Sequence, residues 1–220
     1  MQEEEYGDRT ILALKGKYRE ILEERKPPGK EILAGGKKVP LYKEYLFGGK
    51  CSMLLPETLA DMDARERVVK YRMRNRPPVI KTDRDGDATM AFSLLPLPDG
   101  EEPKGVRERL GCIRGSMAKV WKQNVFYDTG EAEAGGTVVA WMDFRACCLD
   151  GDLYGLLFLF RAAGGDVLGN FHCSFPLYGM WKPAVLKLLE TVNVQEKEDG
   201  MRAAAVVLHE KDGRAEMGET

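Results

Sequence analysis

The stretch GTVVAWMDFRACCLDGDLYGLLFLFRAAGGDVLGNFHCSF, residues 136–175, predicts the centre of the fold. It contains three runs of β-branched, aromatic and other apolar residues, at 137–149, 153–161 and 167–175. Asp150-Gly151 and Gly164-Gly165-Asp166 separate these runs, and glycine favours tight hairpin turns because it adopts positive φ at little steric cost. We therefore expect three consecutive antiparallel strands, a platform that carries no catalytic motif.

The charge balance excludes some classes of partner. The 220 residues include 33 basic and 35 acidic side chains, a net charge of -2. No global field therefore draws the protein to nucleic-acid phosphates or to anionic membranes. The longest apolar run, 153–160, is too short to span a bilayer. We expect a protein partner, no nucleic acid and no membrane insertion, and the oligomeric state is left open.

The cysteines and the first residues bear on the cellular location. Five cysteines form no C-x-x-C pair, and an odd number argues against a closed disulfide framework. The first residues, MQEEEYGDRT, are acidic, whereas a signal peptide needs a basic region followed by an apolar one. We expect a cytoplasmic protein.

We expect one domain, at 39–194, between two appendages. Residues 9–25 place apolar side chains at near-helical spacing, and Pro27-Pro28-Gly29 ends that pattern, which predicts a helical arm over 1–38. Residues 195–220 predict a polar tail with one β-prone island at 203–208. Whether either appendage is ordered is left open.

Glycine, proline and apolar periodicity predict the other elements of the domain. Gly48-Gly49 predicts a hairpin or a corner, and Pro56 predicts the start of a short helix as far as Met62. Apolar residues at spacings of three and four predict two longer helices, at 103–121 and 180–194. Further strand-like runs lie at 41–47, 50–55, 79–82, 88–95 and 125–127.

Several segments, taken in order, form one pattern. They are CSMLLPETLADM (51–62), KYRMRNRPPVIKTD (70–83), ATMAFSLL (88–95), VFYD (125–128), GGTVVAWMDFRA (135–146) and GNFHCSFPLYGMWKPAVLKLLETV (169–192). Together they resemble the PsbP-like α/β sandwich family, which includes a photosystem extrinsic protein, a Ran-binding nuclear import factor and bacterial DcrB-like proteins. The resemblance covers residues 40–194. A branch of uncharacterised Gram-positive bacterial proteins is similar at Gly169, Phe171, Cys173, Trp181 and Pro183.

The resemblance implies an α/β (α+β) fold with a central, mainly antiparallel sheet and helices on both faces. It also implies protein binding rather than catalysis. By that resemblance we expect a non-catalytic module, such as a secretion-associated adaptor or chaperone that shields an apolar segment of a partner. A structural subunit of a homo-oligomer is one alternative.

His172-Cys173 and Cys147-Cys148 are the residues best suited to chemistry. Imidazole and thiolate bind zinc, and a cysteine paired with a histidine can act as a nucleophile. Adjacent strand residues point to opposite faces, however, so at most one histidine and one cysteine share a side. The loop Asp83-Arg84-Asp85-Gly86-Asp87 resembles a calcium loop, but it lacks the distal glutamate and is typical of a turn. We expect no catalytic residue, metal or cofactor, and a metal-binding protein or hydrolase using His172 with a cysteine is a second alternative.

A basic run is the first candidate for partner binding. It is the densest local charge in the chain, and we expect Arg72, Arg74 and Arg76 to face an acidic surface of the partner. The simpler explanation is a solvated face with aliphatic stems lying over the sheet. The run comprises Arg65, Arg67, Lys70, Arg72, Arg74 and Arg76.

An apolar sheet face is the second candidate. Along 153–160 both alternating sets of side chains are apolar, so this strand must be covered on both faces. If the chain's own helices leave part of one face bare, Trp141, Phe158 and Trp181 would bind an apolar segment. Complete coverage by those helices is the simpler explanation, because large exposed apolar patches are rare.

Overall fold

The computed structural model describes residues 29–72, 75–97, 104–148 and 150–195. Residues 1–28 of the predicted arm and the tail beyond 195 therefore lie outside the described residues. The elements are β1 (Glu31–Ala34), β2 (Lys37–Leu46), β3 (Cys51–Pro56), β4 (Ala60–Asp61), α2 (Ala64–Lys70), β5 (Val79–Thr82), β6 (Ala88–Leu95), α3 (Val106–Val120), β7 (Val125–Ala134), β8 (Thr137–Ala146), β9 (Leu153–Ala162), β10 (Gly165–Ser174), a 3-10 turn (Phe175–Leu177), α4 (Tyr178–Leu189) and β11 (Asn193–Val194).

The strands form two antiparallel sheets. The large sheet has the order β4-β5-β6-β10-β9-β8-β7, and the small sheet has the order β1-β2-β3-β11. The meander predicted over 137–175 is confirmed as β8, β9 and β10, and β7 extends it by one strand at the edge. The fold is thus mixed α/β with mostly antiparallel sheets, as predicted.

Turn chemistry explains why these strands pair in this register. Between β7 and β8, Gly135 and Gly136 have φ of 54° and 82°. A two-residue hairpin with positive φ at both positions matches the right-handed twist of the strands, and glycine reaches it without strain. Ala134 and Thr137 are paired on either side of this turn.

Three glycines of the large sheet lie directly opposite an aromatic residue on the neighbouring strand. A Cβ atom at any of these glycines would collide with the facing ring. The missing side chain leaves room for each ring to lie across the adjacent strand, a known way to stabilise a glycine within a sheet. The pairs are Gly169 with Phe158, Gly155 with Phe144, and Gly130 with Trp141.

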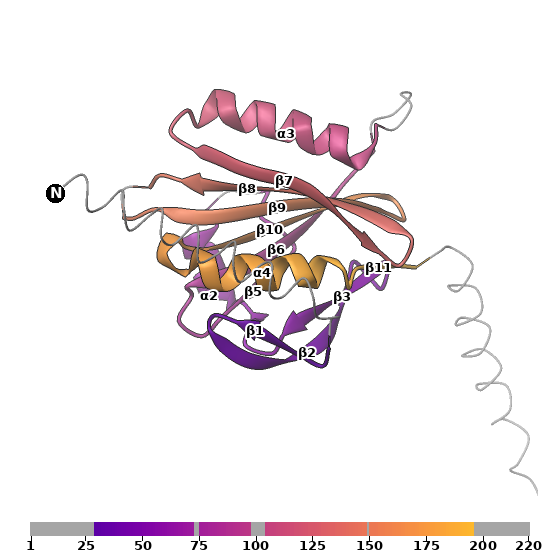
Figure 1. Cartoon of the computed structure of the whole chain (residues 1–220), viewed down its shortest axis with the longest axis horizontal. Helices are drawn as coiled ribbons and strands as arrows, with labels where there is room; N and C mark the ends of the chain where they lie inside the picture. Colours follow the sequence, from indigo (N-terminus) through magenta and orange to yellow (C-terminus); the bar gives the residue numbers. More distant parts are fainter. Residues whose placement is uncertain (1–28, 73–74, 98–103, 149, 196–220) are drawn as a thin grey trace, which may run out of the picture.

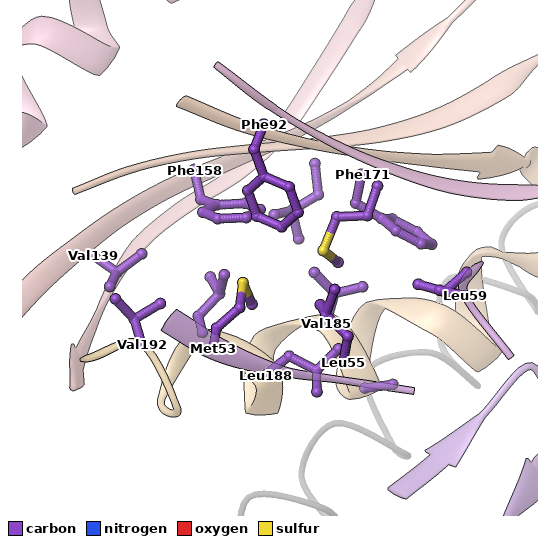
Figure 2. Packing of buried hydrophobic residues seen from close by; sticks show 14 of the residues in the cluster. Met53, Leu55, Leu59, Phe92, Val139, Phe158, Phe171, Val185, Leu188 and Val192 are labelled. Atoms are coloured by element: carbon purple, nitrogen blue, oxygen red, sulfur yellow. The ribbon is translucent and has the colours of Figure 1, made fainter. Parts of the chain in front are cut away.

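The main hydrophobic core lies between the large sheet and a layer made of α4 and the small sheet. Phe92, Phe158 and Phe171 extend from β6, β9 and β10 into this core and are fully buried (Figure 2). Burial of an aromatic or aliphatic side chain of this size contributes roughly 1.5 to 3 kcal/mol. The residues that meet them from β3 and α4 are Met53, Leu55, Val185 and Leu188.

A second cluster lies on the other face of the large sheet, where α3 packs over β8 and β9. Leu110 of α3 is 4% exposed and packs in this cluster with Met142 and Leu159. Figure 1 shows α3 above strands β7 to β10 and α4 below them, between these strands and the small sheet. Alternate residues of β9 thus pack into different clusters, Phe158 into the main core and Leu159 beneath α3.

Three predicted boundaries differ from the structure. Residues 31–38 were assigned to the arm, but β1 pairs with the start of β2, so they belong to the small sheet. Residues 57–62 form no helix, because the backbone of Ala60–Asp61 pairs with β5 instead. The last helix ends at Leu189 rather than near 194, and Asn193–Val194 pairs with β3.

Among the described residues, no helix is both long enough and apolar enough to cross a membrane.

Candidate functional site

Exposed apolar side chains gather where α3 ends and β7 begins. Trp121 is 48% exposed and Tyr127 is 42% exposed, and two exposed valines accompany them. Within the described residues, eight large apolar side chains are exposed, and four of the eight lie in the segment 120–127. We call this set the aromatic turn surface: Val120, Trp121, Val125 and Tyr127.

Backbone and side-chain hydrogen bonds fix the turn that carries this surface. The amide of Trp121 donates to the carbonyl of Met117 and closes α3, at 2.8 Å. The amide of Asn124 donates to the carbonyl of Trp121 at 3.0 Å, which reverses the chain into β7. From the end of β8, the Cys147 thiol donates to the carbonyl of Gln123 at 3.3 Å. The turn is therefore tied both to the helix before it and to the neighbouring strand.

A β-bulge follows the turn within β7. Phe126 pairs with Phe144 and Thr129 pairs with Met142, so two β7 residues, Tyr127 and Asp128, lie opposite Asp143 alone. Bulges bend a strand and re-aim its side chains, and they are frequent beside functional sites. Here the amide of Asp128 donates to Oδ1 of Asp143 at 2.7 Å.

A buried charge network holds the bulge against α4. Nζ of Lys182 lies 2.7 Å from Oδ2 of Asp128 and 2.9 Å from Oδ2 of Asp143. Neither the Lys182 nor the Asp143 side chain is exposed, whereas that of Asp128 is 47% exposed. The Tyr154 hydroxyl donates to Oδ2 of Asp143 at 3.1 Å. We call these residues the Lys182 network: Asp128, Asp143, Tyr154 and Lys182.

Electrostatics keep Lys182 and Tyr154 of this network protonated. Burial lowers the pKa of Lys182, but the attraction of Asp143 and the hydrogen bonds to Asp128 and Asp143 outweigh it, so the pKa lies above its ordinary value. Burial, and then the Asp143 carboxylate, raise the pKa of Tyr154 well above its ordinary value. An ammonium that stays protonated is not a nucleophile, and a phenol that stays protonated is not a base. The network therefore ties β7 to α4.

Basic side chains border the aromatic turn surface. Arg114, Lys119 and Lys122 are exposed and lie in or just after α3. The guanidinium carbon of Arg114 lies 5.3 Å from the ring centroid of Phe126, within cation–π distance. The surface thus combines apolar area with positive charge.

The aromatic residues predicted to bind a partner lie elsewhere. Phe158 is 0% exposed and Trp181 is 4% exposed, both in the main core, so a partner reaches them only if α4 moves. Trp141 is half-buried, and its ring lies across Gly130 and 5.5 Å from Nζ of Lys182. Of the three, only Trp141 borders the candidate site.

Among the described residues, the predicted arginines Arg72 and Arg76 lie far from Trp141 in the order of the large sheet. Arg72 is exposed, Arg76 is half-buried, and Arg74 lies outside the described residues. They follow α2, and the adjoining Tyr71 packs near Ile80 of β5. Three strands separate β5 from β8, the strand that carries Trp141.

The residues considered for metal or nucleophile chemistry do not converge. Cys173 packs in the main core, whereas His172 occupies the alternate position of β10, where the Lys70 charge acts on it. Oδ1 of Asp83 accepts a hydrogen bond from the amide of Ala88 at 3.1 Å and so closes the β5–β6 turn. In the part of the chain that the structure describes, no three His, Cys, Asp or Glu side chains are grouped to hold a metal ion.

Periodicity alone did not reveal the Lys182 network, although two signals of it exist in the sequence. Asp143 occupies an inward position of β8 in register with Val139 and Trp141, where an apolar residue is expected. Lys182 follows Tyr178 by four residues and precedes Val185 by three, so it lies on the apolar stripe of α4. A charge at an apolar position indicates a buried partner.

These features define a mixed α/β sandwich with an exposed aromatic and basic surface at one edge of its large sheet. No protein-family model matches the chain, and no curated protein matches it. Among solved structures, the solution structure of cyanobacterial PsbP (CyanoP) from Synechocystis sp. PCC 6803 has a TM-score of 0.53 at 13% identity. That match covers 77% of this chain and 98% of that chain. The chain therefore has a PsbP-like fold, as the resemblance implied.

Two further solved structures are similar at lower scores. The Saccharomyces cerevisiae Ran-binding protein Mog1p has a TM-score of 0.47 at 10% identity, covering 71% of this chain and 96% of that chain. The Pseudomonas aeruginosa protein of unknown function PA94 has a TM-score of 0.40 at 9% identity, covering 71% and 99%.

Proposed function

We propose that this chain is a non-catalytic protein-binding module and that the aromatic turn surface binds its partner. The observation that carries the proposal is the exposure of Trp121 and Tyr127, 48% and 42%, next to two exposed valines. Gathered apolar side chains on a surface mark interaction sites, and tryptophan and tyrosine contribute most to binding energy at such sites.

The charges around this surface define the chemistry of the partner. Arg114, Lys119 and Lys122 would attract carboxylates, and the aromatic turn surface would bury apolar side chains. The partner is therefore a segment with apolar residues flanked by acidic ones. The sequence predicted a partner with an apolar segment or an acidic surface, and this proposal keeps both features. It does not keep Phe158 and Trp181 as binding residues, because both are buried.

In its finer form, the proposal is that the protein is an adaptor or chaperone that shields this apolar segment and has a secretion-associated role. We propose that it belongs to a Gram-positive bacterial branch of proteins with the PsbP-like fold. The exposed apolar surface supports shielding. An equimolar amount of the protein is then expected to keep an apolar, acidic peptide in solution, as measured by turbidity, and the Trp121→Ala variant is expected to fail.

A cytoplasmic location belongs to the same proposal. All five cysteines are free thiols in the structure, including the exposed Cys112 and Cys148. Exposed free thiols fit a reducing compartment. Fractionation of the producing cells is the measurement, and recovery of the protein outside the cytoplasm would contradict this part of the proposal.

The binding proposal is tested with a random peptide library displayed on phage and selected on the immobilised full chain. The enriched peptides are expected to combine apolar with acidic residues. Truncation of a tryptophan at the centre of an interface costs about 2 kcal/mol or more, so Trp121→Ala is expected to weaken binding on the order of 30-fold.

Tyr45→Ala is the matched control. Tyr45 is 58% exposed, but it lies on β2 of the small sheet. This variant is expected to bind the peptides like the wild type, and all variants are expected to unfold at the wild-type denaturant concentration. Equal binding by wild type, Trp121→Ala and Tyr127→Ala would show that another surface is used. Concentration-dependent dimers in light scattering that Trp121→Ala abolishes would favour the homo-oligomer alternative instead.

A further inference from the structure

A pocket lies between α3 and the edge of the large sheet. Its volume is about 280 Å³, and it is lined by α3, β7 and β8. Helix α3 packs over β8 and β9, whereas β7 is the outermost strand. The pocket therefore opens where the helix leaves the outer face of β7 uncovered.

Helix α3 forms one wall of the pocket, with an arginine at each end and a glycine between them. Arg107 and Arg114 line the pocket and are seven residues apart, about two helical turns and therefore on the same side of α3. Between them, Gly111 also lines the pocket, and a Cβ atom there would have nothing within 4 Å. Leu110 also lines the pocket from α3 as part of the second cluster, and Gly111 adds no side chain.

The opposite wall and the floor are uncharged apart from one glutamate. Thr129 lies on β7, and Ala140 and Met142 lie on β8. Glu131 lies 3.9 Å from Arg107, but the Arg107 side chain is 83% exposed. An ion pair this long and this exposed contributes little, so it leaves Arg107 available to another carboxylate.

We infer that this pocket receives an acidic side chain of the partner segment, held between Arg107 and Arg114 above the apolar floor. The inference rests on the proposed function, because the acidic side chain belongs to the segment that binds the aromatic turn surface. Arg114 lines the pocket, and its guanidinium carbon lies 5.3 Å from the ring centroid of Phe126, the β7 residue between Val125 and Tyr127. Arginine binds carboxylates through two parallel hydrogen bonds, which fixes the position of the acidic residue relative to the apolar ones.

Two variants test the pocket without touching the aromatic turn surface. Arg107→Gln removes one guanidinium and is expected to weaken binding of the selected peptides about tenfold, and Arg107→Lys is expected to restore part of it. Gly111→Leu fills the pocket and leaves every charge in place, and we expect it to weaken binding by about the same factor. Replacing the peptide's acidic residue by its amide is expected to abolish the difference between Arg107→Gln and the wild type.

Each variant has a matched control in the same protein. Arg84→Gln removes an exposed arginine from the β5–β6 turn, and Gly115→Leu adds a side chain one helical turn beyond Gly111 at an equally open position. Both controls are expected to bind like the wild type. Urea denaturation measures the stability of each variant. The two leucine variants are expected to be at least as stable as the wild type, because leucine is favoured over glycine in a helix.

The outcomes separate this inference from the proposed function. Peptides that need Trp121 but bind Arg107→Gln and Gly111→Leu like the wild type would overturn the pocket and leave the aromatic turn surface standing. Selected peptides without acidic residues would do the same. A library that yields no peptide whose binding needs Trp121 would overturn the proposed function, and the pocket with it.

Discussion

The ring of Phe158 lies over Gly169, its direct partner across the β9–β10 ladder, at the place where a side chain at 169 would point. Phe158 is fully buried and belongs to the main core. The packing of Phe158 on the core-facing side of the large sheet therefore depends on the absence of a side chain at position 169.

Gly169→Ala is expected to destabilise the fold. The added Cβ would collide with the Phe158 ring, and overpacking of a core costs about 1 to 3 kcal/mol. Urea denaturation followed by tryptophan fluorescence measures the change. Gly115→Ala is the control, because its Cβ would meet nothing within 4 Å and alanine is favoured over glycine in a helix by about 1 kcal/mol. An equal effect of the two substitutions would contradict the packing of Phe158 on Gly169.

Lys182→Met is expected to cost about 3 kcal/mol or more of unfolding free energy, because removal of one partner leaves a buried carboxylate unpaired. The side chains of Lys182 and Asp143 are both fully buried, and Nζ of Lys182 lies 2.9 Å from Oδ2 of Asp143. Chemical denaturation gives the value.

A second substitution tests whether the unpaired charge is the cause. Adding Asp143→Asn to Lys182→Met removes that charge, so the double variant is expected to be more stable than Lys182→Met alone. Lys119→Met is the control, since Lys119 is exposed on α3 and its loss is expected to change stability by less than about 0.5 kcal/mol. Additive losses in the double variant would show that the pair is not coupled.

The sequence predicted the large sheet well because its signals are local. Asp150-Gly151 and Gly164-Gly165 mark turns through backbone preferences that tertiary contacts do not alter. Helix α2 was missed for the opposite reason. It buries none of its residues, so it shows no apolar stripe, and its start depends on the Asp63 side chain accepting a hydrogen bond from the amide of Arg65.

The candidate site could be predicted only in part because its residues meet through long-range contacts. Asp128 and Lys182 are 54 positions apart in sequence, and they meet where the bulged strand β7 contacts α4. Trp121 was counted as the end of a helix, which is correct, but no local pattern shows whether a helix end is covered. Strand β1 lies within the predicted arm, and the sequence shows it only through Gly35-Gly36, which forms the hairpin turn to β2.

His172 is expected to make the protein less stable in mild acid. Burial, and then the charge of Lys70, lower its pKa from 6.5 to about 4 in the folded state. Above pH 6.5 the imidazole is neutral in both states and contributes nothing. As the pH falls from 6.5 towards 4, the unfolded chain takes up a proton that the folded chain does not, so stability decreases over this range.

The comparison of wild type with His172→Gln isolates this effect from the carboxylates that titrate nearby. The unfolding free energy of the wild type is expected to fall more steeply with decreasing pH between 6.5 and 4 than that of the variant. Parallel curves over this range would show that His172 titrates normally in the folded protein.

Four of the five cysteines are expected to react in two groups with a thiol reagent, and the half-buried Cys147 is expected to react between them. Cys51 and Cys173 are buried, and burial raises the pKa of Cys51 to about 11 and that of Cys173 further still. Thiolate is the reactive form, so neither is expected to react in the folded protein at neutral pH. Cys112 and Cys148 are exposed and are expected to react first.

Mass spectrometry of the labelled peptides identifies which thiols have reacted, and urea is expected to release the remaining ones. Cys112→Ser is the control, because it should lower the fast-reacting count by one without altering the slow group. Cys51 lies on β3 and Cys173 on β10, so the two buried thiols report on opposite walls of the main core. Labelling of Cys173 before unfolding would mean that α4 and the small sheet separate from the large sheet in the native protein, and the same motion would expose Phe158 and Trp181 to a partner.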